Sequence, residues 1–469
     1  MVESSELHWL TLSELASHLQ AGDVSSVAAT EHILRRIEAH DARLHAYATM
    51  MAGSALEEAA RADRERAAGT VRGPLQGVPV AVKDLCDTAG VRTAAGTRVM
   101  RDRVPARDAT VVTRLRDAGA VILGKLSMTE GAYSEHHPDV PVPVNPWSPA
   151  FWSGVSSSGS GVATAAGLCF ASLGSDTGGS IRLPSAMNAL VGIKPSYGRV
   201  PVTGIFPMAA SLDHVGPLCR SVLDAALVLG VLAGFDRDDP RSTRRPVDDY
   251  AAAARAGSSG LHGLRVGFDL AACAGLDPDL VGFVSDAVDM LARLGADVRQ
   301  VTLPSLDAIP GYWSTLCGAE MLVAHEEFFP SHAGDYGPAL RLFLEMSETI
   351  PPRELARVSV ERIDFSGRLQ RVFEEIDVLA CPTLGVRVPS GISVMDPEFL
   401  ARIPAVIRFT APFNLSCNPT ISLPCGWGAD AMPASLQLVG RHFEETTIIR
   451  AAAAYEAATT WHLRRPPLP

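Results

Sequence analysis

The sequence predicts an α/β fold in which helices cover both faces of a β-sheet. Two observations support this prediction. Helical patterns lie between several short apolar segments, and such alternation is typical of a sheet covered by helices, not of an all-helical or all-β protein. The apolar segments are rich in Val, Ile and Leu and are predicted to be strands, at residues 78–82, 121–123, 171–173, 264–268, 378–380 and 421–423.

Composition and charge exclude several classes of function. Of the 469 residues, 47% are hydrophobic and 20% are charged, which is typical of a folded globular chain. The net charge is −11 and no long basic run occurs, so we expect no nucleic-acid partner. No stretch of about 18 apolar residues predicts a membrane-spanning helix. The acidic N-terminus lacks the pattern of a secretory signal, so a cytoplasmic location is expected.

Cysteine and histidine spacing does not predict a metal site. The eight cysteines form no CxxC pair, and we expect reduced, mostly buried thiols. His136 and His137 are adjacent, so their side chains point in different directions, and no HExxH-like ligand set accompanies them. We expect these two residues to line a pocket or lie at the surface.

Residues 1–70 are predicted to be mainly helical. Thr11 and Glu14 fit a capping box, and leucines then recur at helical spacing. The alanine-rich stretch 52–68 carries Glu and Arg residues that suit a solvated helix face.

The α/β part is predicted to begin in the segment 71–235. Valines alternate along 78–82 as a strand requires, and this leaves Lys83 on the opposite face at the end of the strand. Residues 235–260 are rich in Asp, Arg, Pro, Ser and Gly and predict an exposed connection. This connection begins the region 236–375, which is expected to be mainly helical. Residues 376–469 are expected to return to the same sheet. We therefore predict one composite domain over 1–469.

Two segments rich in glycine and serine, 154–161 and 174–180, are the strongest candidates for chemistry. A flexible linker is a poor interpretation, because the first segment runs directly into a helix pattern and then a strand. Neither segment matches GxxxxGK[ST] or GxGxxG, so a nucleotide cradle is disfavoured. Nucleophilic catalysis needs a hydroxyl, a base and donors for the oxyanion. The N–H groups of Thr177, Gly178, Gly179 and Ser180 are candidate donors, because glycines allow close approach of a carbonyl.

The base has two candidates. His214 lies close in sequence to Ser211 and Asp213, but triad members usually converge from separate elements, so we expect a loop histidine with local hydrogen bonds. Lys83 can act instead, because burial disfavours an ammonium charge and lowers the pKa of a lysine. Its alternative is a structural ion pair with Asp84 or another buried acid.

Five segments together resemble the amidase signature family. They are spread along the chain, and the resemblance leaves only about 235–370 unassigned, the region that varies with substrate in that family. The matching segments are GPLQGVPVAVKDLCDTAGVRTAAGT, ATVVTRLRDAGAVILGKLSMTE with VNPWSP, GVSSSGSGVATAAGLCFASLGSDTGGSIRLPSAMNALVGIKPSYGRV, SLDHVGPL and MPASLQLVGRHFEETTIIRAAAAYE.

The resemblance implies a catalytic relay and a fold. Ser180 corresponds to the nucleophile, Ser156 to the bridging serine and Lys83 to the base. In the family the bridging serine follows a cis peptide bond, here Val155–Ser156, where valine replaces the more usual glycine. Asp176 and Arg182 are expected to form a structural ion pair. The implied fold is a mixed sheet of about ten or eleven strands with helices on both faces.

The implied function is hydrolysis of a carbon–nitrogen amide bond through an acyl-enzyme on Ser180, with no metal or organic cofactor. Amides, anilides and carbamates of small molecules are the expected substrates, as in an aryl acylamidase or urethanase, for a monomer or homodimer. An alternative is the glutamine-hydrolysing component of an amidotransferase complex that acts on mischarged tRNA. The stretch 124–147 departs from the sequence expected there. An inactive scaffold would need a damaged relay, yet all three relay residues are present.

Bulky residues near these motifs are candidates for the substrate pocket and suggest an apolar acyl or aryl group. Each of them has an alternative role in core packing. The candidates are Met128, Tyr133, Ile205, Phe206, Trp313, Cys317 and Phe413.

Overall fold

An eleven-stranded mixed sheet runs through this computed structural model, which describes residues 6–390, 393 and 396–468. Its strand order is β1-β3-β2-β4-β6-β5-β10-β11-β9-β7-β8. The predicted α/β fold with helices on both faces of a mixed sheet is confirmed. The strands are β1 (Tyr47–Met50), β2 (Pro79–Lys83), β3 (Val121–Leu126), β4 (Ala171–Asp176), β5 (Val191–Lys194), β6 (His214–Cys219), β7 (Arg265–Phe268), β8 (Asp297–Gln300), β9 (Val378–Pro382), β10 (Thr420–Trp427) and β11 (Pro433–Gly440).

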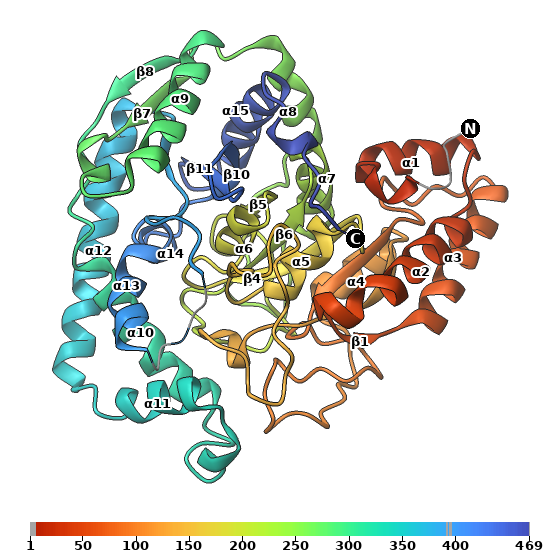
Figure 1. Cartoon of the computed structure of the whole chain (residues 1–469), viewed down its shortest axis with the longest axis horizontal. Helices are drawn as coiled ribbons and strands as arrows, with labels where there is room; N and C mark the ends of the chain where they lie inside the picture. The colour runs from red at the N-terminus through yellow and green to blue at the C-terminus, as the bar shows by residue number, and fades with distance from the viewer. Residues whose placement is uncertain (1–5, 391–392, 394–395, 469) are drawn as a thin grey trace.

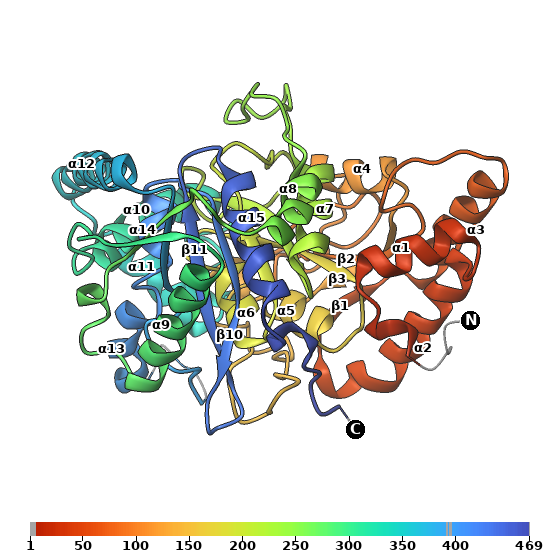
Figure 2. The same ribbon diagram turned by 90° about the horizontal axis from the view of Figure 1, so that it is seen from above.

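Helices connect most of these strands. At one end of the molecule lie α1–α3, and at the opposite end lie α10–α13 (Figures 1 and 2). The helices are α1 (Leu12–Ala21), α2 (Ser26–Leu44), α3 (Ala52–Ala67), α4 (Thr110–Asp117), α5 (Ser158–Ala165), α6 (Arg182–Met187), α7 (Val222–Leu232), α8 (Tyr250–Ala256), α9 (Pro278–Arg293), α10 (Ile309–Ala324), α11 (Pro338–Ser347), α12 (Pro352–Glu375), α13 (Pro397–Val406), α14 (Ala411–Leu415) and α15 (Glu445–Ala457).

The sheet is parallel where β2 lies between β3 and β4, and where β7 lies between β8 and β9. The other pairings are antiparallel. Strands β2 and β4 lie side by side, with Val82 opposite Leu173. This pairing places the carboxyl ends of both strands at one edge of the sheet, where Lys83 ends β2 and Asp176 ends β4.

Local patterns predicted several elements correctly. The capping box forms, because the Thr11 side chain accepts from the Glu14 N–H and the Glu14 side chain accepts from the Thr11 N–H. The six predicted strands are part of β2, β3, β4, β7, β9 and β10. A small-residue helix, α5, also precedes β4 as expected.

Other elements differ from the sequence predictions. The mainly helical segment 1–70 contains β1, and the predicted connection 235–260 contains α8. His214 is the first residue of β6 and not a loop residue. Five strands, β1, β5, β6, β8 and β11, were not predicted, because strand formation depends on pairing and burial against neighbours more than on local propensity. In the described ranges, no helix combines the length and hydrophobicity needed to cross a bilayer.

Candidate active site

Lys83 lies fully buried at the end of β2 and contacts two serines. Its Nζ is 2.6 Å from Oγ of Ser156 and 2.8 Å from Oγ of Ser175. Burial lowers the pKa of Lys83 to about 7, although Cys86, Asp176 and Asp213 partly oppose the shift. A lysine with this pKa is neutral in a large fraction of molecules near neutral pH and can accept a proton.

Lys83 does not pair with the acid that follows it. Asp84 instead lies 3.6 Å from Nζ of Lys125, a second buried lysine, and accepts from the N–H of Ala94. The side chains of Lys83 and Asp84 therefore do not form the ion pair that was the alternative interpretation of Lys83.

Ser156 lies just before α5, and the peptide bond that joins it to Val155 is cis. Its carbonyl oxygen accepts from the N–H of Thr129, and its side chain is fully buried. Val155, the residue before Ser156, lines the cavity that contains Ser180.

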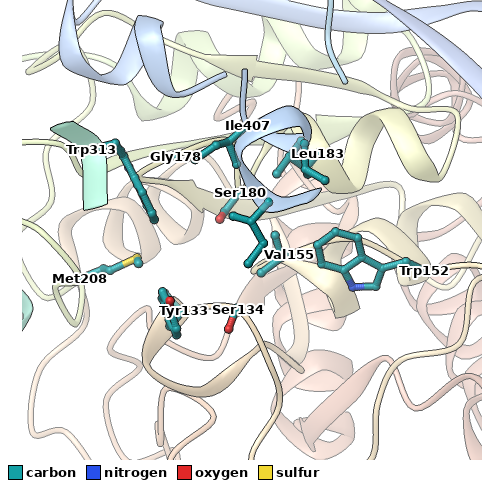
Figure 3. A pocket seen from close by; sticks show the side chains of 13 residues that line it. Tyr133, Ser134, Trp152, Val155, Gly178, Ser180, Leu183, Met208, Trp313 and Ile407 are labelled. Carbon is teal, nitrogen blue, oxygen red and sulfur yellow. The ribbon is translucent and has the colours of Figure 1, made fainter. Parts of the chain in front are cut away.

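Ser180 lies in the turn between β4 and α6, and its side chain projects into a cavity (Figure 3). The residue is 7% exposed. Within the described ranges, no hydrogen bond joins Ser156 to Ser180. The lysine-to-serine contact is therefore formed, whereas the contact between the two serines is not.

The turn that carries Ser180 presents three N–H groups that have no acceptor among the described residues. The N–H of Gly179 donates to Asp176 at 2.9 Å, so it is not available to an oxyanion. The N–H groups of Thr177, Gly178 and Ser180 donate to no acceptor in the part of the chain that the structure describes. These three remain candidates for an oxyanion hole. Gly179 was also predicted to be a donor, but its N–H is already bonded to Asp176.

Two contacts hold this loop from outside. The Thr177 hydroxyl donates to Oδ1 of Asp213 at 2.6 Å, and the indole N–H of Trp313 donates to the Thr177 carbonyl at 2.8 Å. A Cβ at Gly178 would lie 2.7 Å from the Trp313 ring, so the close approach of the indole requires glycine at this position.

Asp176 and Arg182 form a bidentate ion pair beneath the loop. Nη2 and Nε of Arg182 lie 2.8 and 2.9 Å from the two carboxylate oxygens, and both side chains are fully buried. Burial alone would raise the pKa of Asp176, but the Arg182 charge and its hydrogen bonds hold that pKa well below its ordinary value. Asp176 also accepts from the N–H groups of Gly179 and Ile181, so the pair fixes the turn that carries Ser180.

The neighbouring histidines take other roles. Nδ1 of His214 lies 2.7 Å from the Leu212 carbonyl oxygen, and burial lowers the pKa of this histidine well below its ordinary value. His136 contacts Oγ of Ser158 through Nε2 at 2.9 Å. No group of three or more potential metal ligands occurs within the described ranges.

The cavity around Ser180 has an almost wholly apolar lining, and none of its described lining residues is charged. Of the sequence candidates, Tyr133 and Trp313 line it. Met128 lines a separate polar cavity, and Ile205, Phe206, Cys317 and Phe413 are not among the described lining residues of this cavity. The remaining lining residues are Ala132, Ser134, Trp152, Val155, Gly178, Leu183, Met208, Ile403, Val406 and Ile407.

Sequence reasoning missed most of this lining. Val155 and Leu183 flank the two serines and could have been found from their position in the motifs. Ile403 and Ile407 come from the α13 region, which has no motif to mark it. Ser175 was also missed as a partner of Lys83, although it lies within the GSDTGGS segment.

A family model described as Amidase matches residues 28–449. The chain belongs to the amidase signature family. Among its relatives, the protein named "Putative amidase AmiD" from Mycobacterium tuberculosis is 45% identical over 465 residues, with 98% of this chain and 96% of the relative covered. A glutamyl-tRNA(Gln) amidotransferase component from Roseiflexus is 38% identical over 493 residues, with 99% of each chain covered.

A solved structure agrees with this assignment to the amidase signature family. Peptide amidase from Stenotrophomonas maltophilia is 31% identical, with a TM-score of 0.82 and coverage of 97% of this chain and 98% of that one. The family, its amidase relatives and the shared fold establish an amide-hydrolysing enzyme.

Proposed function

We propose that this amidase cleaves an apolar amide, anilide or carbamate of small size through an acyl-enzyme on Ser180. The observation that carries the proposal is the contact of 2.6 Å between Nζ of Lys83 and Oγ of Ser156, whose neighbour Val155 lines the same cavity as Ser180. Burial lowers the pKa of Lys83 to about 7, which suits a base that works near neutral pH.

The proposed reaction is a proton relay followed by acyl transfer. Neutral Lys83 takes the proton of Ser156, and Ser156 takes the proton of Ser180. The Ser180 oxygen attacks the carbonyl carbon of the substrate at the same time. The free N–H groups of Thr177, Gly178 and Ser180 stabilise the oxyanion. The proton returns through Ser156 to the leaving amine, and water then repeats the sequence to release the acid.

The test compares Ser180→Ala with the wild type on a panel of aliphatic amides, anilides and carbamates. We expect Ser180→Ala to lose all turnover and all labelling by a fluorophosphonate while its thermal unfolding stays unchanged. Lys83→Ala should lower the turnover rate by several orders of magnitude. Ser160→Ala is the matched control, because it removes a buried hydroxyl of α5 that donates to the Leu173 carbonyl and not to the relay. Turnover retained by purified Ser180→Ala would refute the assignment.

The tRNA-dependent amidotransferase is the second candidate, because relatives with that name are 38% identical. The apolar lining argues against it, since glutamine carries two charges that need polar partners. A glutaminase assay with and without the other components of such a complex separates the two. The amide hydrolase needs no nucleic acid and acts as a monomer or homodimer.

A further inference from the structure

We propose that the substrate site has two connected chambers and that the outer one binds an extended apolar group of the substrate. The inference rests on the proposed function, because it concerns the molecule that Ser180 attacks. It narrows the substrate class to amides or carbamates that carry a long alkyl or aryl-alkyl group.

The inner chamber is too small for such a group. It is the cavity around Ser180, and it encloses about 80 Å³. For comparison, a protein cavity known to bind a single benzene ring has a volume of roughly 150 Å³. The inner chamber therefore accommodates the scissile bond and a small substituent, and a larger group must extend beyond it.

The outer chamber offers that space. It encloses about 390 Å³ between α10, α11 and α13, and none of its described lining residues is charged. One wall is the face of α10 that carries Gly311, Ser314 and Thr315. Leu342 and Met346 of α11 form part of the opposite wall, and they are 38% and 61% exposed. Binding of an apolar group would remove this exposed apolar surface from water, which favours occupancy.

Four residues line both chambers, so the two chambers adjoin at these side chains: Tyr133, Trp313, Ile403 and Ile407. Two of these are held in place. The Tyr133 ring stacks on Phe343 with centroids 4.2 Å apart and an interplanar angle of 16°, and the Trp313 indole donates to Thr177. Figure 3 shows Trp313 and Tyr133 at one side of the Ser180 cavity, with Trp152 at the other. The passage to the outer chamber therefore leaves the inner one on the Trp313 side.

Alkyl fluorophosphonates of increasing chain length test the proposal. Oγ of Ser180 forms a bond to phosphorus, the P–F bond breaks, fluoride leaves and the serine proton passes to the relay. The inactivation rate constant should rise by about fourfold for each methylene that becomes buried, until the chamber is full.

The decisive variant is Gly311→Phe. A Cβ at Gly311 meets no described atom within 4 Å, and Gly311 lines the outer chamber, so a larger side chain at this position would occupy part of that chamber. We expect this variant to lose at least about tenfold in rate with a decyl probe and to keep the wild-type rate with an ethyl probe, since several methylenes are excluded. Ser314→Phe, one turn along the same face, is the second variant.

Gly367→Phe is the matched control. Gly367 is also a helical glycine whose Cβ would meet open space among the described residues, but it lies on α12 outside both chambers. Gly367→Phe should leave the inactivation rates with both probes unchanged. Equal inactivation rates for decyl and ethyl probes in the wild type would overturn the two-chamber proposal. An equal fall in the rates of both probes in Gly311→Phe and Ser314→Phe would overturn it as well.

Failure of the proposed nucleophile gives a different result, because then no probe of any length reacts. In that case, binding of decanamide, whose only large group is the alkyl chain, to Ser180→Ala is measured by calorimetry with and without Gly311→Phe. Binding at least about tenfold weaker with Gly311→Phe supports the outer chamber. Unchanged binding refutes it.

Discussion

The indole N–H of Trp313 donates a hydrogen bond of 2.8 Å to the carbonyl oxygen of Thr177, 136 residues away in the sequence. This contact joins α10, in the region expected to vary with substrate, to the loop that precedes Ser180. The same indole lies against Gly178 and lines both chambers. A substrate-facing helix therefore also positions the candidate oxyanion donors.

Trp313→Phe is expected to lower kcat for a short amide by about fivefold to tenfold, because a buried hydrogen bond contributes about 1 kcal/mol and its loss loosens the oxyanion loop. KM for the same amide should change less. Steady-state kinetics measure both constants. Tyr312→Phe, the preceding residue on α10, is the control and should leave both unchanged. A raised KM with an unchanged kcat would mean that Trp313 only binds substrate.

The pH dependence should follow Lys83, whose pKa burial lowers to about 7. In the proposed mechanism the base is the neutral amine, whose population falls tenfold per pH unit below the pKa. We therefore expect kcat/KM to rise by about tenfold between pH 5 and 6 and to level off above about pH 8. Thermal unfolding at each pH shows that the enzyme stays folded. A rate that is flat from pH 6 to 9 argues against a lysine base.

Ser175→Ala tests the second contact of Lys83. The Ser175 oxygen lies 2.8 Å from Nζ and stabilises the charged amine, so its removal should lower the lysine pKa and move the pH profile toward acid. We also expect kcat to fall by about tenfold, because the amine loses a group that orients it. Ser172→Ala, which removes a buried hydroxyl from the same strand, should leave the pH profile in place. An unshifted profile in Ser175→Ala would contradict this role.

Asp176→Asn should destabilise the fold by about 3–5 kcal/mol, because it leaves the buried charge of Arg182 without its partner. Urea unfolding followed by circular dichroism measures the change. Glu398→Gln is the control, since Glu398 and Arg402 form an exposed pair on α13 and such pairs contribute about 0.5 kcal/mol. A loss of activity at unchanged stability would indicate that Asp176 acts in the reaction and not in holding the turn.

Sequence patterns predicted a useful part of the fold. The alternating valines before Lys83 form β2, and the Thr11 capping box starts α1, because both depend on residues close together in the chain. Strand β8 escaped prediction because all four of its residues are exposed and it carries no apolar pattern. Strand β6 contains Gly216 and Pro217, which are more typical of a loop than of a strand, so its sequence did not predict a strand.

The candidate site shows the same division. The sequence by itself determined the family and indicated the candidate reacting groups: one lysine that ends an apolar strand, and two serines in glycine-rich segments. Only the tertiary structure decided that Ser175 is a second partner of Lys83, that Gly179 donates to Asp176 and that Trp313 holds Thr177. It also decided which apolar side chains surround Ser180. The physical reason is that distances between side chains from separate elements arise only when the sheet and its helices pack together.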